Sequence, residues 1–114
     1  MDDKTGVILN DEIDDFSFGF SNGFGLPPSP LNHIAPGKRP MSSICGSIIE
    51  RNGKIETVIG ASGGSRIISG VFNTLLNNYV FNMTLIDAVK EPRLHDQLYP
   101  NHVSSKNIYH SAYT

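Results

Sequence analysis

Three short motifs in this sequence contain residue types suited to holding one small molecule. Carboxylates crowd "NDEIDDF" at residues 10–16, two serines adjoin in "KRPMSSI" at residues 38–44, and two glycines adjoin in "VIGASGGSRI" at residues 58–67. Carboxylates attract an ammonium group, hydroxyls donate hydrogen bonds to a carboxylate, and neighbouring backbone N–H groups stabilise a developing oxyanion. Together the motifs suit a free α-amino acid head group with an acyl carbon further along its side chain.

Each motif taken alone also has a plain structural explanation. The acids could form a solvated chain end or a cation site, and the serines could simply lie on the surface. The glycine motif sits between an expected strand and an expected helix, where it could form an oxyanion hole or a tight turn without a ligand. It matches neither the phosphate loop, which ends in Gly-Lys-Ser/Thr, nor the G-x-G-x-x-G fingerprint.

No metal site or cofactor is expected from the sequence. The acidic motif has no histidine within a few residues and lacks the EF-hand spacing. Cys45 is the only cysteine, so neither a cysteine metal site nor an internal disulfide can form. The four histidines show no ligand spacing; they are His33, His95, His102 and His110.

The bulk composition narrows the classes of partner. The chain has 114 residues, 39% of them hydrophobic and 18% charged, which suits one domain with a modest core. A net charge of -2 implies no strong field for nucleic acid. No apolar run approaches the roughly 18 residues that a membrane span needs. The acidic N-terminal stretch "MDDKTG" does not resemble a signal peptide.

Several elements are expected to position the motifs. Gly6–Asn10 is typical of a short buried strand before the acidic motif. Residues 17–40 are rich in Gly, Pro, Ser and Asn and predict a long irregular loop, whose apolar side chains favour packing over a free linker. Ser47–Glu50 and Ile55–Gly60 flank Asn52-Gly53, which is a strong hairpin signal.

Two helices are expected after the glycine motif. From Ser65 onward a 3.6-residue period predicts a helix with one apolar stripe, which favours core packing over a partner surface. The stripe consists of Ile68, Val71, Phe72, Leu75 and Tyr79. Thr84 and Asp87 resemble a capping box that opens a second helix, which Pro92 closes. The polar stretch Asn101–Thr114 has no clear period and predicts poor order.

Four longer segments resemble one known family. "NDEIDDFS", "FGLPPSPLNHIAPGKRPMSS", "IGASGGSRI" and "EPRLHDQLYPN" are similar, in this order, to the small subunit of γ-glutamyltransferases, also called glutathione hydrolases. The resemblance covers roughly Thr5 to Asn101. It implies an α+β chain, part of the αββα sandwich of an N-terminal nucleophile (Ntn) hydrolase and only the small-subunit part. Residues 1–101 would be the family fragment and residues 102–114 a disordered tail.

The resemblance also implies an activity and roles for individual residues. In this family a threonine at the new N-terminus of the small subunit attacks the γ-glutamyl amide of glutathione, and the glutamyl group passes to water, an amino acid or a peptide. By similarity, Glu12 and Asp15 would hold the α-amino group of the substrate. Ser42 and Ser43 would bind its α-carboxylate, helped by the large subunit. The N–H groups of Gly63 and Gly64 would form the oxyanion hole.

The match has one large departure from the family pattern. The family's catalytic threonine lies well upstream of the acidic motif, whereas only nine residues precede Asn10 here. Thr5 matches an ordinary family Thr-Gly, so it is not expected to be the nucleophile. The sequence is therefore interpreted as an internal piece of an enzyme that is inactive alone, or as an inactive truncated homologue that binds a ligand or partner. By resemblance the expected location is extracellular or at the cell surface.

Overall fold

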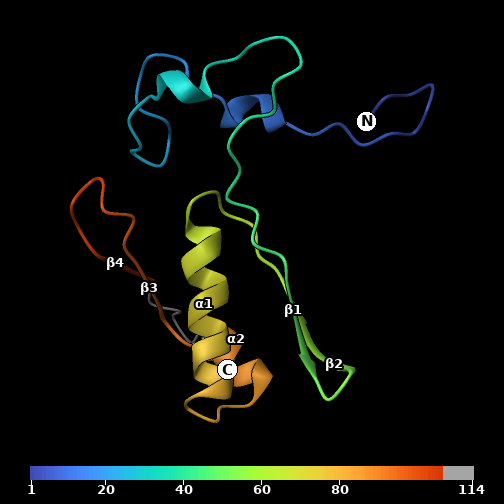
Figure 1. Cartoon of the computed structure of the whole chain (residues 1–114), viewed down its shortest axis with the longest axis vertical. Helices are drawn as coiled ribbons and strands as arrows, with labels where there is room; N and C mark the ends of the chain where they lie inside the picture. Colours follow the sequence, from blue (N-terminus) through green and yellow to red (C-terminus); the bar gives the residue numbers. More distant parts are fainter. Residues whose placement is uncertain (107–114) are drawn as a thin grey trace, which may run out of the picture. The chain divides into compact units, whose positions relative to one another are not determined.

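The computed structural model describes residues 1–106 and mixes helix with strand. It divides into two units, Met1–Ser42 and the part that begins at Ser43. Figure 1 labels the elements of the second unit, which carries all the α-helices and strands of the described part.

The first unit is built mainly from irregular backbone. Its regular elements are two short 3-10 helices, η1 (Glu12–Asp15) and η2 (Pro30–Asn32). The buried strand expected over residues 6–10 is wrong, because Val7, Ile8 and Leu9 are exposed and pair with no strand of residues 1–106. Instead the backbone amide of Asp2 donates to the Val7 carbonyl, which closes a local turn.

Residues 17–40 form the expected irregular stretch, but they bury few of their apolar side chains. Phe16, directly before the stretch, is the buried hydrophobic residue of this unit. Phe18 and Phe20 are largely exposed and stack on each other, with ring centroids 6.4 Å apart. Ser17, at the start of the stretch, forms a parallel bridge with His33. The loop is therefore tied at its base while its aromatic residues stay uncovered.

The second unit begins with the predicted hairpin. Strands β1 (Ser47–Arg51) and β2 (Lys54–Ile59) pair antiparallel, with Ile48 opposite Val58. Asn52 and Gly53 have φ of 52° and 73°, the left-handed values that a two-residue turn of this kind requires. The hairpin prediction is confirmed, and β2 leads directly into the glycine motif.

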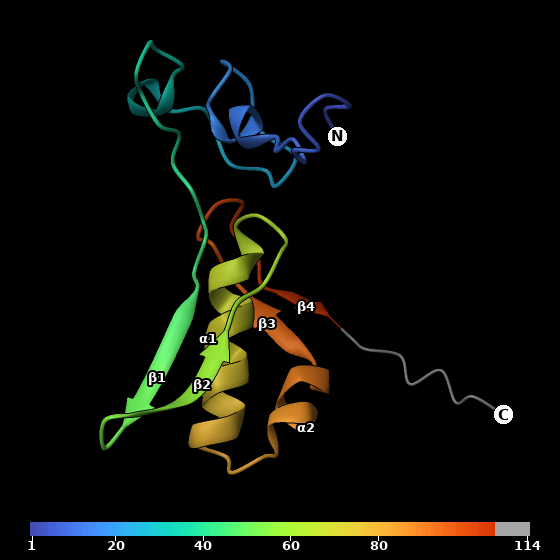
Figure 2. The same cartoon turned by 90° about the vertical axis from the view of Figure 1, so that its right-hand side faces the viewer.

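Helix α1 (Arg66–Tyr79) follows the glycine motif as predicted, but its buried face is rotated from the expected stripe. The buried positions are Ile67, Val71 and Thr74, which share one side of the helix. Ile68 and Phe72 are 54% and 62% exposed, so their assignment to the core is wrong. Figures 1 and 2 show why: α1 lies between the β1–β2 hairpin and the α2–β3 segment, which leave part of its surface open.

Helix α2 (Leu85–Lys90) begins at the predicted cap. The Asp87 amide donates to the Thr84 hydroxyl at 3.2 Å, and that hydroxyl donates to the Asp87 carboxylate at 2.5 Å. The cap is therefore confirmed, although the acid contacts the threonine side chain rather than its backbone amide. This short helix contacts α1, and its Ala88 is fully buried.

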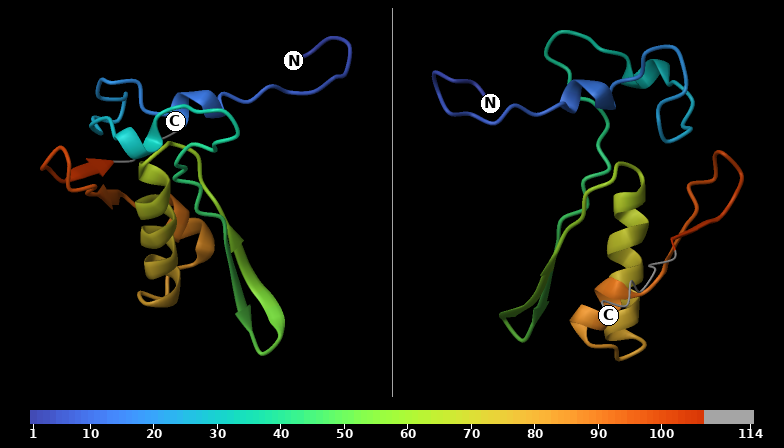
Figure 3. Two further views of the ribbon diagram at one scale, coloured as in Figure 1. Left: turned by 45° about the horizontal axis from the view of Figure 1, so that its top comes forward. Right: turned by 180° about the vertical axis from the view of Figure 1, so that it is seen from behind.

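Two strands near the end of the described chain were not predicted. Strand β3 (Arg93–His95) pairs antiparallel with β4 (Ser104–Lys106), and Figure 3 shows this pair from two sides. The prediction of poor order from Asn101 onward is corrected for Ser104–Lys106, because three-residue strands carry too short a pattern to show a period. The rest of the predicted tail, residues 107–114, lies outside the described residues.

A hydrogen bond between side chains joins the hairpin to α1. The hydroxyls of Thr57 and Tyr79 are 2.7 Å apart, and Thr57 is only 8% exposed. Few hydrophobic side chains are buried in the described part of the chain: Phe16, Ile67, Val71 and Ala88. A polar bond at the hairpin–helix junction consequently contributes a larger share of the stability than it would beside a large core.

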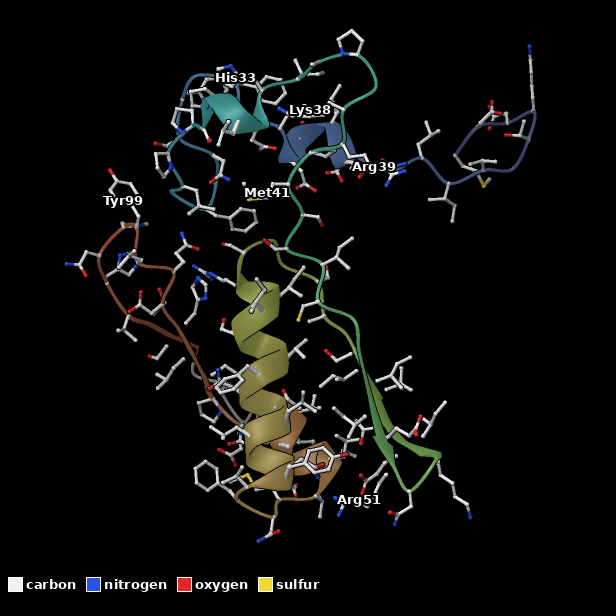
Figure 4. All side chains as sticks on the ribbon, in the orientation of Figure 1. His33, Lys38, Arg39, Met41, Arg51 and Tyr99 are labelled. Carbon is white, nitrogen blue, oxygen red and sulfur yellow. The ribbon has the colours of Figure 1, made fainter. Side chains whose placement is uncertain are left out.

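We predict that Tyr79→Phe destabilises the second unit by about 1–2 kcal/mol, because it leaves the buried Thr57 hydroxyl without its partner. Urea unfolding followed by circular dichroism measures the change. The matched control is Tyr99→Phe, at an exposed tyrosine in the β3–β4 connection (Figure 4), which should shift stability by less than about 0.5 kcal/mol. Equal midpoints for the two variants would contradict the role given to this bond.

Candidate functional site

The acidic motif folds into η1, and this local geometry selects two of its carboxylates. Side chains three residues apart eclipse one another in a 3-10 helix, so Glu12 and Asp15 share one face. Both residues are exposed, and neither is paired with a cation among residues 1–106. The amide of Glu12 donates to the Asn10 side-chain oxygen at 3.0 Å, which fixes the start of the turn. The result is a pair of solvent-facing carboxylates on one side of a short helix.

Asn32 ties η1 to the chain that leads into the serine pair. Its side-chain nitrogen donates to the Asp15 carbonyl at 2.7 Å, and its side-chain oxygen accepts from the Met41 amide at 2.8 Å. The residue is buried, and its amide nitrogen also lies 3.4 Å from the Ser17 hydroxyl. One amide side chain thus bridges Asp15 and the residue directly before Ser42. We call these two bonds the Asn32 clamp.

A lysine reinforces the same corner of the first unit. The Lys38 ammonium donates to the backbone carbonyls of Leu31 and His33, at 2.6 and 3.0 Å. Figure 4 shows Lys38 and His33 beside η2, above the chain that descends to Met41. The Lys38 side chain therefore links two points of the loop that carries Asn32. Its ammonium group is bonded to backbone carbonyl oxygens.

The serine pair falls at the boundary between the two units. Ser42 is the last residue of the first unit and Ser43 the first of the second, and they are exposed and half-buried respectively. Met41, one residue earlier, is held by the Asn32 clamp. The structure thus places Ser42 next to the held end of the first unit, in the same unit as Glu12 and Asp15.

The glycine pair forms the turn that enters α1. Gly63 and Gly64 have φ of 134° and 58°, values that favour glycine over residues with a side chain. A Cβ at Gly63 would meet nothing within 4 Å, so backbone conformation and not crowding within the chain requires glycine there. Neither amide donates a hydrogen bond to a described residue, and both precede the positive end of a helix of 14 residues.

Thr5 lies in a turn rather than in a site. Its hydroxyl donates to the Asp2 carboxylate, and its amide donates to the same carboxylate at 3.1 Å. The Thr5 hydroxyl, with backbone amides, holds the pKa of the exposed Asp2 below its ordinary value. The Thr5 side chain is thus used as a partner of Asp2.

The candidate residues therefore fall into two groups, one in each unit. Glu12, Asp15 and Ser42 belong to the first unit, while Ser43, Gly63 and Gly64 belong to the second. No three His, Cys, Asp or Glu side chains of residues 1–106 could hold a metal ion together, and His110 lies outside that range. No helix of the described chain has the length and apolar character to cross a bilayer.

Asn32 has no role predicted from the sequence, although it is the residue that holds the backbone of the first group. The available signal was its place in a segment with many prolines, "PPSPLNHIAPGKRP". Proline has no backbone N–H to donate, so such a segment cannot form a hydrogen-bonded ladder and needs side-chain partners. An asparagine supplies both a donor and an acceptor.

Comparison with known proteins places these motifs in a family context. A family model described as gamma-glutamyltranspeptidase matches residues 1–113. Glutathione hydrolase proenzyme 1 of Schizosaccharomyces pombe is 51% identical over 102 residues, which are 89% of this chain but 16% of that protein. Glutathione hydrolase 4 of Arabidopsis thaliana, whose name describes it as inactive, is 43% identical over 107 residues, 91% of this chain and 56% of that one.

Solved structures agree with the sequence relatives. A mutant γ-glutamyltranspeptidase of Helicobacter pylori matches with a TM-score of 0.78 and 41% identity, covering 89% of this chain and 55% of that one. The γ-glutamyltranspeptidase of Pseudomonas nitroreducens complexed with L-DON matches with a TM-score of 0.76 and 46% identity, covering 87% and 52%. The chain thus spans about half of each of these solved chains and less than a fifth of the S. pombe relative.

We predict that Asn32→Ala loosens the loop that carries the Asn32 clamp. Removing the amide leaves the Asp15 carbonyl and the Met41 amide without their partner, at a cost of about 1.4 kcal/mol or more. Tryptic cleavage after Lys38, followed by mass spectrometry, should become about tenfold faster if local opening limits the cut. Asn101→Ala, at an exposed asparagine, should leave the rate unchanged. A wild-type rate in Asn32→Ala would refute the clamp.

Proposed function

The chain belongs to the γ-glutamyltranspeptidase family, and from this premise we propose that it carries part of a pocket for a γ-glutamyl group. The substrate would be glutathione or another γ-glutamyl compound, whose γ-amide bond is cleaved and whose glutamyl group passes to water, an amino acid or a peptide. The fold would be the small-subunit portion of an Ntn-hydrolase sandwich. No cofactor is needed for this chemistry.

The observation that carries the proposal is the shared face of Glu12 and Asp15 on η1. The α-amino group of a γ-glutamyl compound is a cation near neutral pH, and two exposed carboxylates without a cationic partner in the described chain suit it. Because the Asn32 clamp fixes the Asp15 backbone, the carboxylate pair is held ready before substrate arrives.

The remaining candidate residues suit the other charges of the same molecule. The Ser42 and Ser43 hydroxyls would donate to the α-carboxylate, together with groups of the large subunit. The free amides of Gly63 and Gly64 would stabilise the negative oxygen that forms when the γ-carbonyl is attacked. Ammonium, carboxylate and oxyanion are thus each matched by groups of the required polarity.

The nucleophile and the rest of the pocket would come from outside these 114 residues. The family uses a threonine whose own α-amino group is free, and Thr5 is an internal residue whose hydroxyl bonds to Asp2. In the complete enzyme a large subunit would cover the uncovered apolar side chains of this piece. An extracellular or cell-surface location would follow from the same family membership.

A second candidate function is a catalytically inactive homologue that binds a ligand or partner. It is supported by the A. thaliana relative whose name describes it as inactive and to which this chain is 43% identical over 107 residues. Such a protein would keep the carboxylate pair and the glycine turn without the chemical step. Substrate binding without turnover separates this candidate from a catalytic one.

We predict that the purified 114-residue chain releases no product from a γ-glutamyl p-nitroanilide, because it presents no N-terminal threonine. The assay follows p-nitroaniline absorbance, with Thr5→Ala as the control. Both proteins should match the buffer rate. Turnover that disappears in Thr5→Ala would make Thr5 the nucleophile, and turnover that persists would require a nucleophile elsewhere in the chain.

We also predict that the carboxylates of Glu12 and Asp15 contribute to substrate binding when the rest of a family enzyme is supplied. Residues 5–101 would replace the matching segment of the S. pombe glutathione hydrolase proenzyme 1, to which the chain is 51% identical. In this hybrid, Asp15→Asn should raise KM for the γ-glutamyl anilide at least about tenfold, because it removes a charged partner of the ammonium group. KM and kcat are measured separately.

The matched control for Asp15→Asn is Asp11→Asn, one residue before η1. It removes the same charge from the same motif but from outside the Glu12–Asp15 face, so KM should change less than about twofold. Equal KM values for the two variants would mean that the total negative charge of the motif attracts the substrate, and not the placement of Asp15 beside Glu12 on η1. A hybrid that matures without gaining activity would contradict the proposed pocket as a whole.

A further inference from the structure

Four polar side chains outside the proposed pocket link the start of α1 to the segment that follows β3. The Ser65 hydroxyl lies 2.6 Å from the side-chain oxygen of Gln97, which in turn lies 2.9 Å from His95 Nε2. His95 Nδ1 lies 2.8 Å from the Ser69 hydroxyl. All four residues are half-buried. Two separate parts of the chain are thus joined at two points, one helical turn apart on α1.

The directions of these hydrogen bonds follow from the chemistry of the groups. The Gln97 side-chain nitrogen donates to the Tyr99 carbonyl at 2.9 Å, so its oxygen is the atom that faces Ser65 and His95. An amide oxygen only accepts, so Ser65 and His95 Nε2 are both donors. A neutral imidazole that carries its proton on Nε2 has a free lone pair on Nδ1, which accepts from the Ser69 hydroxyl at 2.8 Å; the same hydroxyl lies farther, 3.2 Å, from the Arg66 carbonyl. Each bond in the set therefore has one donor and one acceptor.

This network begins at the residue next to the glycine pair. Ser65 follows Gly64 directly and is the N-cap residue of α1, yet its hydroxyl makes no capping bond to its own helix. That hydroxyl is turned instead toward Gln97. Ser69 supplies the second attachment, and Asn73 a third, because its side-chain nitrogen donates to the Leu94 carbonyl at 3.1 Å. The first two turns of α1 are consequently held against the β3 segment.

The glycine pair depends on such outside support. Glycine enters conformations of positive and negative φ with similar ease, so Gly63 and Gly64 do not hold their own shape. Their amides also donate no hydrogen bond to the described chain. Their carbonyls accept from the Arg66 and Ile67 amides, at 3.3 and 3.0 Å, so the orientation of the two N–H groups follows the first turn of α1. What holds that turn in place, beginning with Ser65, therefore also directs the glycine amides.

We propose that Gln97 is a positioning residue, supported by His95, which fixes the direction of the Gly63 and Gly64 amides through Ser65. This inference rests on the proposed function, because the order of the two amides matters for catalysis only if the glycine pair stabilises an oxyanion. A preorganised donor needs no rearrangement when charge develops, which is the source of its catalytic value. The carboxylate pair of η1 takes no part in this inference.

The test measures backbone order at the two glycines by ¹⁵N relaxation on the full 114-residue chain without ligand. In the unmodified chain, order parameters at Gly63 and Gly64 should be near 0.85, the value of rigid backbone. In Gln97→Ala they should fall below about 0.6, while residues of α2 keep their values. Asn101→Ala, which removes an exposed side-chain amide, should change neither. Unchanged glycine values in Gln97→Ala would overturn the proposal.

Conservative variants distinguish a local effect at the two glycines from a general loss of structure. Gln97→Glu keeps an acceptor oxygen for Ser65 and His95 and should keep the glycines ordered. If Gln97→Ala also disorders α2, the pair Ser65→Ala and Ser65→Thr decides: the alanine variant should loosen the glycines, and the threonine variant should restore them. Equal order in these two variants would also overturn the proposal. Because no substrate is present, this outcome is independent of the KM test that bears on the proposed function.

Discussion

The bond pair made by Asn32 is the constraint on which the first unit depends. This unit has little regular structure and few buried apolar residues, so neither a sheet ladder nor a core fixes its backbone. One buried amide supplies both a donor and an acceptor and joins Asp15 to Met41 across the loop. A buried amide of this kind is costly to leave unpaired, which makes a single arrangement of the loop strongly preferred.

The second unit also contains a side-chain amide that links segments distant in sequence. Gln97 receives two hydrogen bonds on its oxygen and gives one from its nitrogen, and it joins the start of α1 to the β3 segment. In each unit the amide lies outside the group of residues suited to the ligand and holds the backbone next to it. Such a division leaves the carboxylates of η1 and the amides of the glycine pair free for an external partner.

Local sequence signals predicted the elements whose pattern is complete within a few residues. Asn52-Gly53 identified the hairpin, and Thr84 with Asp87 identified the start of α2, because turn and cap chemistry act over four residues or fewer. The exposed Val7–Leu9 run and the rotated face of α1 could not be predicted, because burial depends on which neighbours cover an apolar residue. The candidate ligand residues were recognisable from motif chemistry and resemblance, but Asn32 and Gln97 act through contacts that are distant in sequence.

The central claim is that this chain recognises the α-amino end of a γ-glutamyl compound through η1. Its most direct test is a titration of the ¹⁵N-labelled 114-residue chain with L-glutamate and, separately, with glutarate, which lacks the α-ammonium group. We expect L-glutamate to shift the amide signals of Glu12–Asp15 and glutarate to leave them in place. Equal shifts with both compounds, or shifts confined to other residues, would contradict recognition of an ammonium group by this turn.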